Sequence, residues 1–129
     1  MKAKTIAYWI TTVLTALLIG SGGIMQCLRA HDAVAGIVTL GYPAYFVVLL
    51  GVWKVLGAAA ILAPRFPRLK EWAYAGIVFD LSGASWSHAA SGTGAGNVIA
   101  PLVFTVLAMA SWALRPESRV LGKVLPAKA

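Results

Sequence analysis

The segment PRFPRLKEWAYAGIVFDLSGASWSH, residues 64–88, joins a proline-containing turn to an apolar run that contains ionisable residues. It begins with a basic turn that two prolines interrupt, and the apolar run that follows carries Asp80 and His88 in its interior. A second apolar run, just upstream, carries Lys54. Ionisable groups inside helices of membrane length are costly, so each requires a partner or a function. The sequence therefore predicts a small membrane protein with a polar centre.

The composition also indicates a membrane protein. Of the 129 residues, 60% are hydrophobic and 12% are charged, whereas a soluble domain carries about 25% charged residues. Four apolar runs occupy most of the chain, which we expect to form a single membrane domain over residues 1–129. These runs leave no room for a soluble catalytic domain, so any chemistry must take place within the bilayer or at its edge.

The apolar runs predict four helices, at residues 5–27, 43–63, 72–91 and 98–114. Pro64 and Pro67 end the second helix, and the glycine-rich GTGAGN separates the third from the fourth. In the first helix, Gly20, Gly22 and Gly23 suit either close approach by a neighbouring helix or a local kink. The predicted fold class is therefore all-α, a transmembrane four-helix bundle.

Two segments lie outside these helices. The connection at residues 28–42 is moderately apolar, and it is either a short interfacial helix or a loop folded back over the bundle. His31 and Asp32 within it are either an exposed pair or part of a lid over a site between the helices. The tail, residues 115–129, is basic and partly amphipathic, and we expect it to lie on the membrane surface.

The distribution of lysine and arginine predicts the orientation. Four crossings place the amino end, the second link and the tail on one side of the membrane. That side has nine basic residues, against Arg29 alone in the two other links; the nine are Lys2, Lys4, Arg65, Arg68, Lys70, Arg115, Arg119, Lys123 and Lys128. By the positive-inside rule we expect both termini to be cytoplasmic, in a multi-pass protein of a bacterial inner membrane. We also expect aromatic residues at the outer boundary (Tyr42, Tyr45, Phe46) and at the inner one (Phe66, Trp72, Tyr74, Trp112).

Several function classes are disfavoured by the sequence. The basic residues adjoin apolar runs, where they meet lipid head groups, and they form no stripe interleaved with base-stacking aromatics, so we expect no nucleic-acid partner. Cys27 is the one cysteine, which excludes an internal disulfide and a CxxC redox pair. The two histidines have no neighbouring thiols or paired carboxylates, so the sequence predicts no metal site.

Lys54 and Asp80 are predicted to lie at nearly equal depth. Lys54 is nine residues from Ala63 and Asp80 is eight from Trp72, which places them about 13.5 Å and about 12 Å from the cytoplasmic ends of their helices. A short turn joins these helices, so they are antiparallel neighbours and the two charges can pair. The pair is either a structural lock on helix register, or a polar pocket for a ligand head group or a proton relay; a third alternative has Lys54 snorkelling to the interface.

The third helix carries further candidate residues. Asp80, Ala84 and His88 follow at four-residue spacing on one small and polar face, beside Ser87. His88 is either a helix-end histidine bonded to a carbonyl or a site residue that exchanges protons near neutrality. For Glu71 we favour a cap at the helix start, against the helix dipole, over a position at a pocket mouth.

The pattern GVWKVLGAAAILAPRFPRLKEWAYAGIVFDLSGASWSH resembles the DoxX-like family of small four-helix membrane proteins. The matching positions are Lys54, Gly57, Pro64, residues 71–76, Gly83, Ala84, Ser87 and His88, and the ending SWALRP, residues 111–116, is similar to the family's usual close. The resemblance implies kinship with the small membrane subunit of a thiosulfate:quinone oxidoreductase. Other relatives are associated with oxidative-stress and sulfur-handling enzymes, and the wider group resembles the membrane part of the vitamin K-dependent carboxylase, so a quinone-type ligand is expected.

The leading hypothesis is a DoxX-like membrane subunit that binds a quinone or a similar lipid-soluble ligand in support of redox chemistry. The chain has no cofactor motif and no thiol pair, so we expect no catalysis by this chain alone, and its partners would be lipids, an oxidoreductase subunit or a second copy. Two alternatives are a non-catalytic scaffold and a small-solute transporter, which requires a continuous polar path. The candidate ligand-binding residues are Lys54, Asp80, His88, Trp53, Ser87, Trp86 and Glu71.

Overall fold

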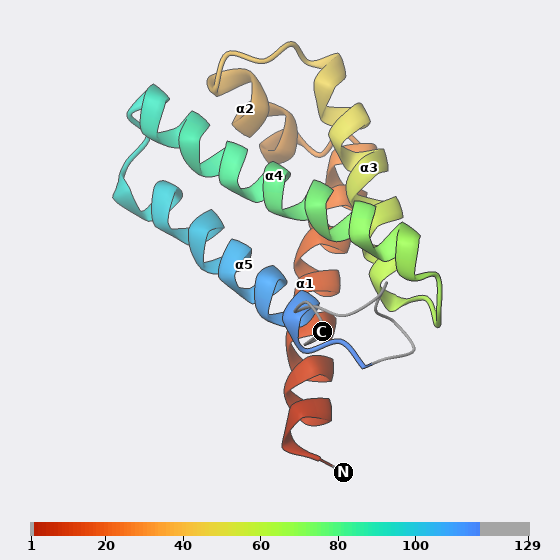
Figure 1. The fold of residues 1–129 in the computed structure, drawn as a ribbon. Coiled ribbons are helices and arrows are strands. Elements are labelled where there is room, and N and C mark those ends of the chain that lie inside the picture. The colour runs from red at the N-terminus through yellow and green to blue at the C-terminus, as the bar shows by residue number, and fades with distance from the viewer. Residues whose placement is uncertain (1, 117–129) are drawn as a thin grey trace.

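The computed structural model describes residues 2–116, and this part of the chain contains five helices and no strand (Figure 1). They are α1 (Ala3–Cys27), α2 (His31–Thr39), α3 (Tyr45–Leu62), α4 (Pro67–Ser91) and α5 (Ala95–Ala113). The four predicted long helices are present, and α2 occupies the connection for which a helix and a loop were both considered. The surface location predicted for the tail falls mostly on residues 117–129, which lie outside the described residues.

The helix boundaries differ from the prediction mainly at α4. This helix begins at Pro67, which occupies its first turn, rather than at Trp72. Proline is tolerated there because the first-turn N–H groups have no partner within the helix. The preceding Arg65 and Phe66 adopt left-handed backbone angles, with φ of 63° and 53°. The chain therefore reverses within residues 63–66, and the basic turn predicted from sequence is shorter than expected.

The four long helices form a ring in which α1 contacts α3 and α5, and α4 contacts α3 and α5. Figure 1 shows the start of α1, the α3–α4 link and the end of α5 at one end, which we call the inner end. The short α2 and the α4–α5 turn lie at the opposite, outer end. Packing between α1 and α3 is the most extensive in the ring, and packing between α3 and α4 is much less extensive.

The close packing of α1 on α3 depends on two glycines. A Cβ atom built on Gly23 would lie 2.8 Å from Lys54 Cβ and 2.9 Å from the Gly51 carbonyl oxygen. One built on Gly51 would lie 2.7 Å from the backbone nitrogen of Cys27. The two backbones thus touch, as small residues allow at helix interfaces in membranes. The sequence left two alternatives for the glycines of α1, close approach by a neighbouring helix or a local kink. The structure shows close approach, at Gly23.

Within residues 2–116, three helices are long and apolar enough to cross a membrane: α1, α3 and α5. The outward surface of the ring exposes large apolar side chains, among them Leu17, Leu56, Phe79, Trp86 and Val106. A surface of this kind is suited to lipid rather than to water. The protein is therefore a multi-pass membrane protein. The fourth long helix, α4, carries Arg68, Lys70, Glu71 and Asp80 and falls outside the apolar set.

Substituting Gly51 by alanine tests the close approach of α1 and α3. The added methyl group would meet backbone atoms of α1 that have no room to move, so we expect a loss of about 1–3 kcal/mol in the free energy of unfolding. Gly22→Ala is the matched control, because a Cβ there has no atom within 4 Å. Thermal unfolding of the purified protein in detergent measures both, and equal stability of the two variants would contradict the packing described.

Candidate functional site

The predicted pairing of Lys54 with Asp80 is present between α3 and α4. Lys54 Nζ lies 3.6 Å from Asp80 Oδ2, and each side chain is 21% exposed. At this separation the contact is an ion pair without a formed hydrogen bond. Within residues 2–116 neither side chain has a hydrogen bond to a third group, so the remaining ammonium donors and carboxylate acceptors retain capacity for further partners.

Two spaces meet at this pair. The first is a groove of about 730 Å³ between α3 and α4, which we call the α3–α4 groove; besides Lys54 and Asp80 its lining includes Trp53, Trp72 and Ile77. The second, the outer pocket, has about 190 Å³ and is lined by Lys54, Phe79 and Asp80 together with residues nearer the outer end: Ile37, Leu40, Tyr42, Phe46, Leu50, Gly83, Ala84 and Ser87. The charged pair is thus accessible from both sides.

Ser87, at the edge of the outer pocket, forms a hydrogen bond with Tyr42 that the sequence did not predict. Its hydroxyl lies 2.8 Å from the Tyr42 hydroxyl, which joins the α2–α3 connection to α4. Two residues from the end of α2, Ile37 and Leu40, line the same pocket. The connection therefore lies over a space between the helices, as in the lid alternative, whereas His31 and Asp32 themselves are exposed at the start of α2.

Two candidate residues lie away from the pair. His88 Nδ1 is 2.7 Å from the Thr93 hydroxyl, at the end of α4. The histidine is therefore bonded at a helix end, as one alternative predicted, but to a hydroxyl and not to a carbonyl. Trp86 is 79% exposed on the outer surface of α4. Neither residue lines the α3–α4 groove or the outer pocket.

Glu71 belongs to a different cluster, and the predicted cap is wrong. Because α4 begins at Pro67, Glu71 lies beyond its first turn. Glu71 Oε1 instead pairs with the Arg115 guanidinium at 2.7 Å, and Oε2 accepts a hydrogen bond from Trp112 Nε1 at 3.0 Å. The residue lines a space of about 270 Å³ between α4 and α5, on the other side of α4 from α3.

This contact is part of an inner polar cluster, which comprises Thr12, Glu71, Tyr74, Ser111, Trp112 and Arg115. The Ser111 hydroxyl lies 2.6 Å from that of Thr12 and 2.7 Å from that of Tyr74, so it links α1, α4 and α5. Arg115 is 2% exposed, and its guanidinium lies 5.5 Å and 5.3 Å from the ring centroids of Tyr74 and Trp112. The aromatic-belt position expected for Tyr74 is therefore wrong, since this side chain is 2% exposed.

Lys70 is a second residue whose role differs from that expected. The sequence counts it among the basic residues at the cytoplasmic boundary, yet its side chain is fully buried. Its ammonium donates to the carbonyl oxygens of Ala60 and Ala63, at the end of α3. Lysine near a helix C-terminus satisfies carbonyls that have no partner within the helix. Lys70 thus fastens the start of α4 to the end of α3.

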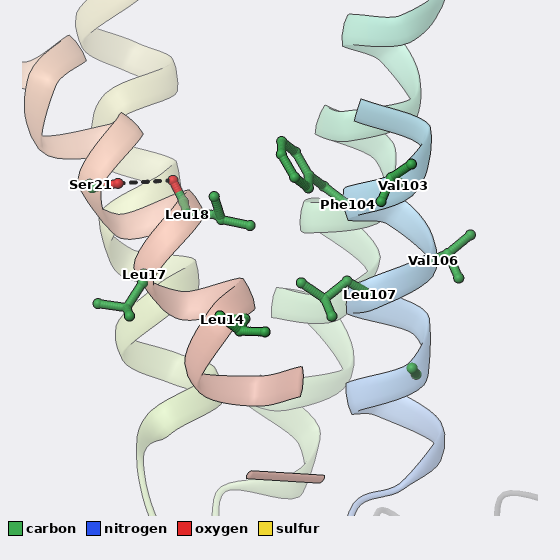
Figure 2. A pocket seen from close by; sticks show the side chains of 9 residues that line it. Leu14, Leu17, Leu18, Ser21, Val103, Phe104, Val106 and Leu107 are labelled. Atoms are coloured by element: carbon green, nitrogen blue, oxygen red, sulfur yellow. Dashed lines mark hydrogen bonds between the residues drawn. The ribbon is translucent and has the colours of Figure 1, made fainter. Parts of the chain in front are cut away.

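A further space is lined almost entirely by apolar side chains. It has about 670 Å³ and lies between α1 and α5, where Leu14, Leu18, Phe104 and Leu107 approach one another (Figure 2). Its one polar side chain, Ser21, donates to the Leu18 carbonyl of its own helix at 3.3 Å. This space lies apart from Lys54 and Asp80 and offers no charged group, so it is not part of the candidate site.

Comparison with known proteins shows a match to the DoxX-like family over residues 10–111. The chain belongs to the DoxX-like family. No curated protein and no solved structure matches it. The matched region of this DoxX-like protein contains Lys54, Asp80 and the outer pocket, whereas Trp112 and Arg115 of the inner polar cluster lie just beyond it.

Among residues 2–116, no three histidine, cysteine, aspartate or glutamate side chains form a group that could hold a metal ion. Between α3 and α4 the structure presents the ammonium group of Lys54, the carboxylate of Asp80 and the hydroxyl groups of Tyr42 and Ser87, which are suited to hydrogen bonding, charge stabilisation and proton exchange.

Replacing Ser111 by alanine tests whether the inner polar cluster holds the bundle together. The change removes two buried hydrogen bonds and leaves the Thr12 and Tyr74 hydroxyls without this partner, so we expect a loss of about 1–3 kcal/mol in the free energy of unfolding. Ser21→Ala, which removes an exposed hydroxyl bonded within one helix, is the control and should change stability little. Chemical or thermal unfolding in detergent provides the measurement, and an unchanged Ser111→Ala variant would refute a stabilising role.

Proposed function

We propose that this DoxX-like protein crosses the bacterial inner membrane four times, with both termini cytoplasmic, and binds a quinone or a similar lipid-soluble ligand at Lys54 and Asp80 in support of redox chemistry. The observation that carries the proposal is an ion pair with unused hydrogen-bonding capacity at the junction of two spaces. The α3–α4 groove has the size of a small-molecule site, since such sites have about 300–1,000 Å³.

The geometry of the pair supports a ligand contact over a purely structural one. A buried ion pair repays the loss of hydration only with close geometry and with its remaining donors and acceptors satisfied. The 3.6 Å separation and the partial exposure of both side chains do not meet that description. A ligand head group placed between the two charges would supply the missing hydrogen bonds.

The chemistry of the two groups is complementary to a quinone and its reduced form. The Lys54 ammonium can donate to a carbonyl oxygen, and the Asp80 carboxylate can accept from a hydroxyl. Trp53 in the α3–α4 groove and Phe79, which lines both spaces, provide aromatic surfaces for ring packing. The protein would hold the head group and exchange protons with it, while electrons would come from a partner oxidoreductase subunit.

Fourfold crossing is supported by the lengths and the order of the helices. The 25 residues of α4 extend about 37 Å, more than the hydrocarbon thickness of about 30 Å. Its basic residues and Glu71 lie in its first five positions, at the inner end, and Asp80 is paired. The amino end, the α3–α4 link and the end of α5 lie together at that inner end, where the basic residues concentrate (Figure 1).

A scaffold that acts without a ligand is the second candidate. It is favoured by the position of the Lys54–Asp80 pair, which joins the two neighbouring long helices with the least extensive packing. A transporter has less support, because the α3–α4 groove continues toward the inner end between apolar side chains, including Leu56, Leu69 and Ile77. These residues provide no polar path beyond the pair.

Thermal unfolding of the detergent-purified protein with a panel of quinones and quinols tests the ligand proposal. We expect a quinone to raise the Tm of the wild type by several degrees, because a ligand that binds only the folded state stabilises it. Lys54→Gln and Asp80→Asn should abolish the shift. Trp53→Leu should weaken it, whereas Trp86→Leu, at an exposed tryptophan outside both spaces, should not.

Exchanging the two charges distinguishes the ligand proposal from the scaffold hypothesis. In the double variant Lys54→Asp, Asp80→Lys the ion pair can re-form with its charges reversed. We expect recovery of basal stability without recovery of the quinone shift. If no quinone shifts the wild type and the exchange restores stability fully, the pair is a structural lock and the scaffold reading replaces the ligand proposal.

A further inference from the structure

The inner half of the α3–α4 groove has no role in the proposed head-group site. Below the charged pair its lining is apolar, from Leu56 and Ala60 on α3 and from Leu69, Ala73 and Ile77 on α4. Trp72, on the same stretch, is 81% exposed, and Leu56 is 61% exposed, so this half opens to the side of the bundle. In a bilayer an apolar groove of this form accommodates a hydrocarbon chain.

Two arginines without a carboxylate partner lie close in the chain to Leu69, the lining residue nearest the start of α4. Arg65 in the α3–α4 link and Arg68 in the first turn of α4 are both exposed. Within residues 2–116 neither takes part in an ion pair. The nearest acidic residue along the chain, Glu71, is already bonded to Arg115 and Trp112. The end of the groove therefore carries two uncompensated positive charges.

The depth of these arginines matches that of lipid phosphates. Arg68 lies twelve residues before Asp80 on the same helix, which corresponds to about 18 Å along the helix axis. Half of the hydrocarbon core measures about 15 Å. If Asp80 lies near the middle of the membrane, Arg68 lies just outside the hydrocarbon, at the level of the head groups.

We propose that the inner half of the α3–α4 groove binds an anionic phospholipid. Its phosphate contacts Arg65 and Arg68, and one acyl chain lies in the groove against Leu56, Leu69 and Ile77. Arginine forms bidentate charge-assisted hydrogen bonds with phosphate, and the cytoplasmic leaflet is rich in anionic lipid. This site rests on the proposed orientation, in which the inner end is cytoplasmic, but it is distinct from the head-group site at Lys54 and Asp80 and stands whether or not that site binds a quinone.

Lipid titration in detergent tests this proposal. The Tm is measured with added phosphatidylglycerol and, separately, with phosphatidylcholine of the same chain length. We expect phosphatidylglycerol to raise the Tm of the wild type by several degrees more than phosphatidylcholine does. This difference should disappear in the double variant Arg65→Gln, Arg68→Gln. It should persist in Lys2→Gln, Lys4→Gln, which removes the same charge from the same end of the molecule, at the start of α1.

Two further measurements test the acyl chain. Gly76→Leu places a side chain in the groove at a position where a Cβ has no atom within 4 Å, and it should reduce the phosphatidylglycerol shift while both arginines remain. Inorganic phosphate alone should give the wild type no comparable shift. Equal loss of the shift in the two glutamine variants would mean a general surface charge, and an unaltered shift in Gly76→Leu would exclude the groove; either result overturns the proposal.

Discussion

The close approach of α1 and α3 at Gly23 and Gly51 is the constraint on which the rest of the structure depends. Because the two backbones touch there, α3 has little freedom to rotate or slide, and Lys54 is held with its Cβ against α1. The short link at residues 63–66 then reverses the direction of the chain. Lys70 fastens the start of α4 to carbonyl groups at the end of α3. Because α1 fixes the position of α3 and Lys70 ties the start of α4 to the end of α3, Asp80 lies beside Lys54.

The helix with the most polar residues, α4, is stable among apolar neighbours because most of its polar groups meet a partner from another part of the chain. Leaving such groups unpaired in an apolar environment would cost several kcal/mol each. The partners come from α3 and its C-cap, from the α2–α3 connection, from α5 and from Arg115, two residues beyond α5. The contacts are Lys70 with Ala60 and Ala63, Glu71 with Trp112 and Arg115, Tyr74 with Ser111, Asp80 with Lys54, Ser85 with the Val98 carbonyl, and Ser87 with Tyr42.

The sequence predicts those features that depend on nearby residues. The pairing of Lys54 with Asp80 follows from helix rise and from a short link, both of which can be counted along the chain. The cap expected for Glu71 and the boundary position expected for Tyr74 fail because their partners lie 41 and 37 residues away along the chain. The boundary position expected for Lys70 fails for a similar reason, since counting charges along the chain does not reveal that a lysine is buried against carbonyl groups at a helix end. The contact of Thr12 with Ser111 spans 99 residues, and local spacing carries no signal for it.

The contrast between the two polar centres supports different roles for them. In the inner polar cluster, Ser111 bonds two hydroxyls, Glu71 uses both carboxylate oxygens, and Arg115 lies against two aromatic rings. A network whose members bond one another in this way stabilises one packing arrangement. The Lys54–Asp80 pair is longer, has no hydrogen bond to a third group and lies where two spaces meet, so its hydrogen-bonding capacity is incompletely used. This difference in bonding between the two polar centres is the physical reason for proposing a ligand at Lys54 and Asp80 and not at the inner polar cluster.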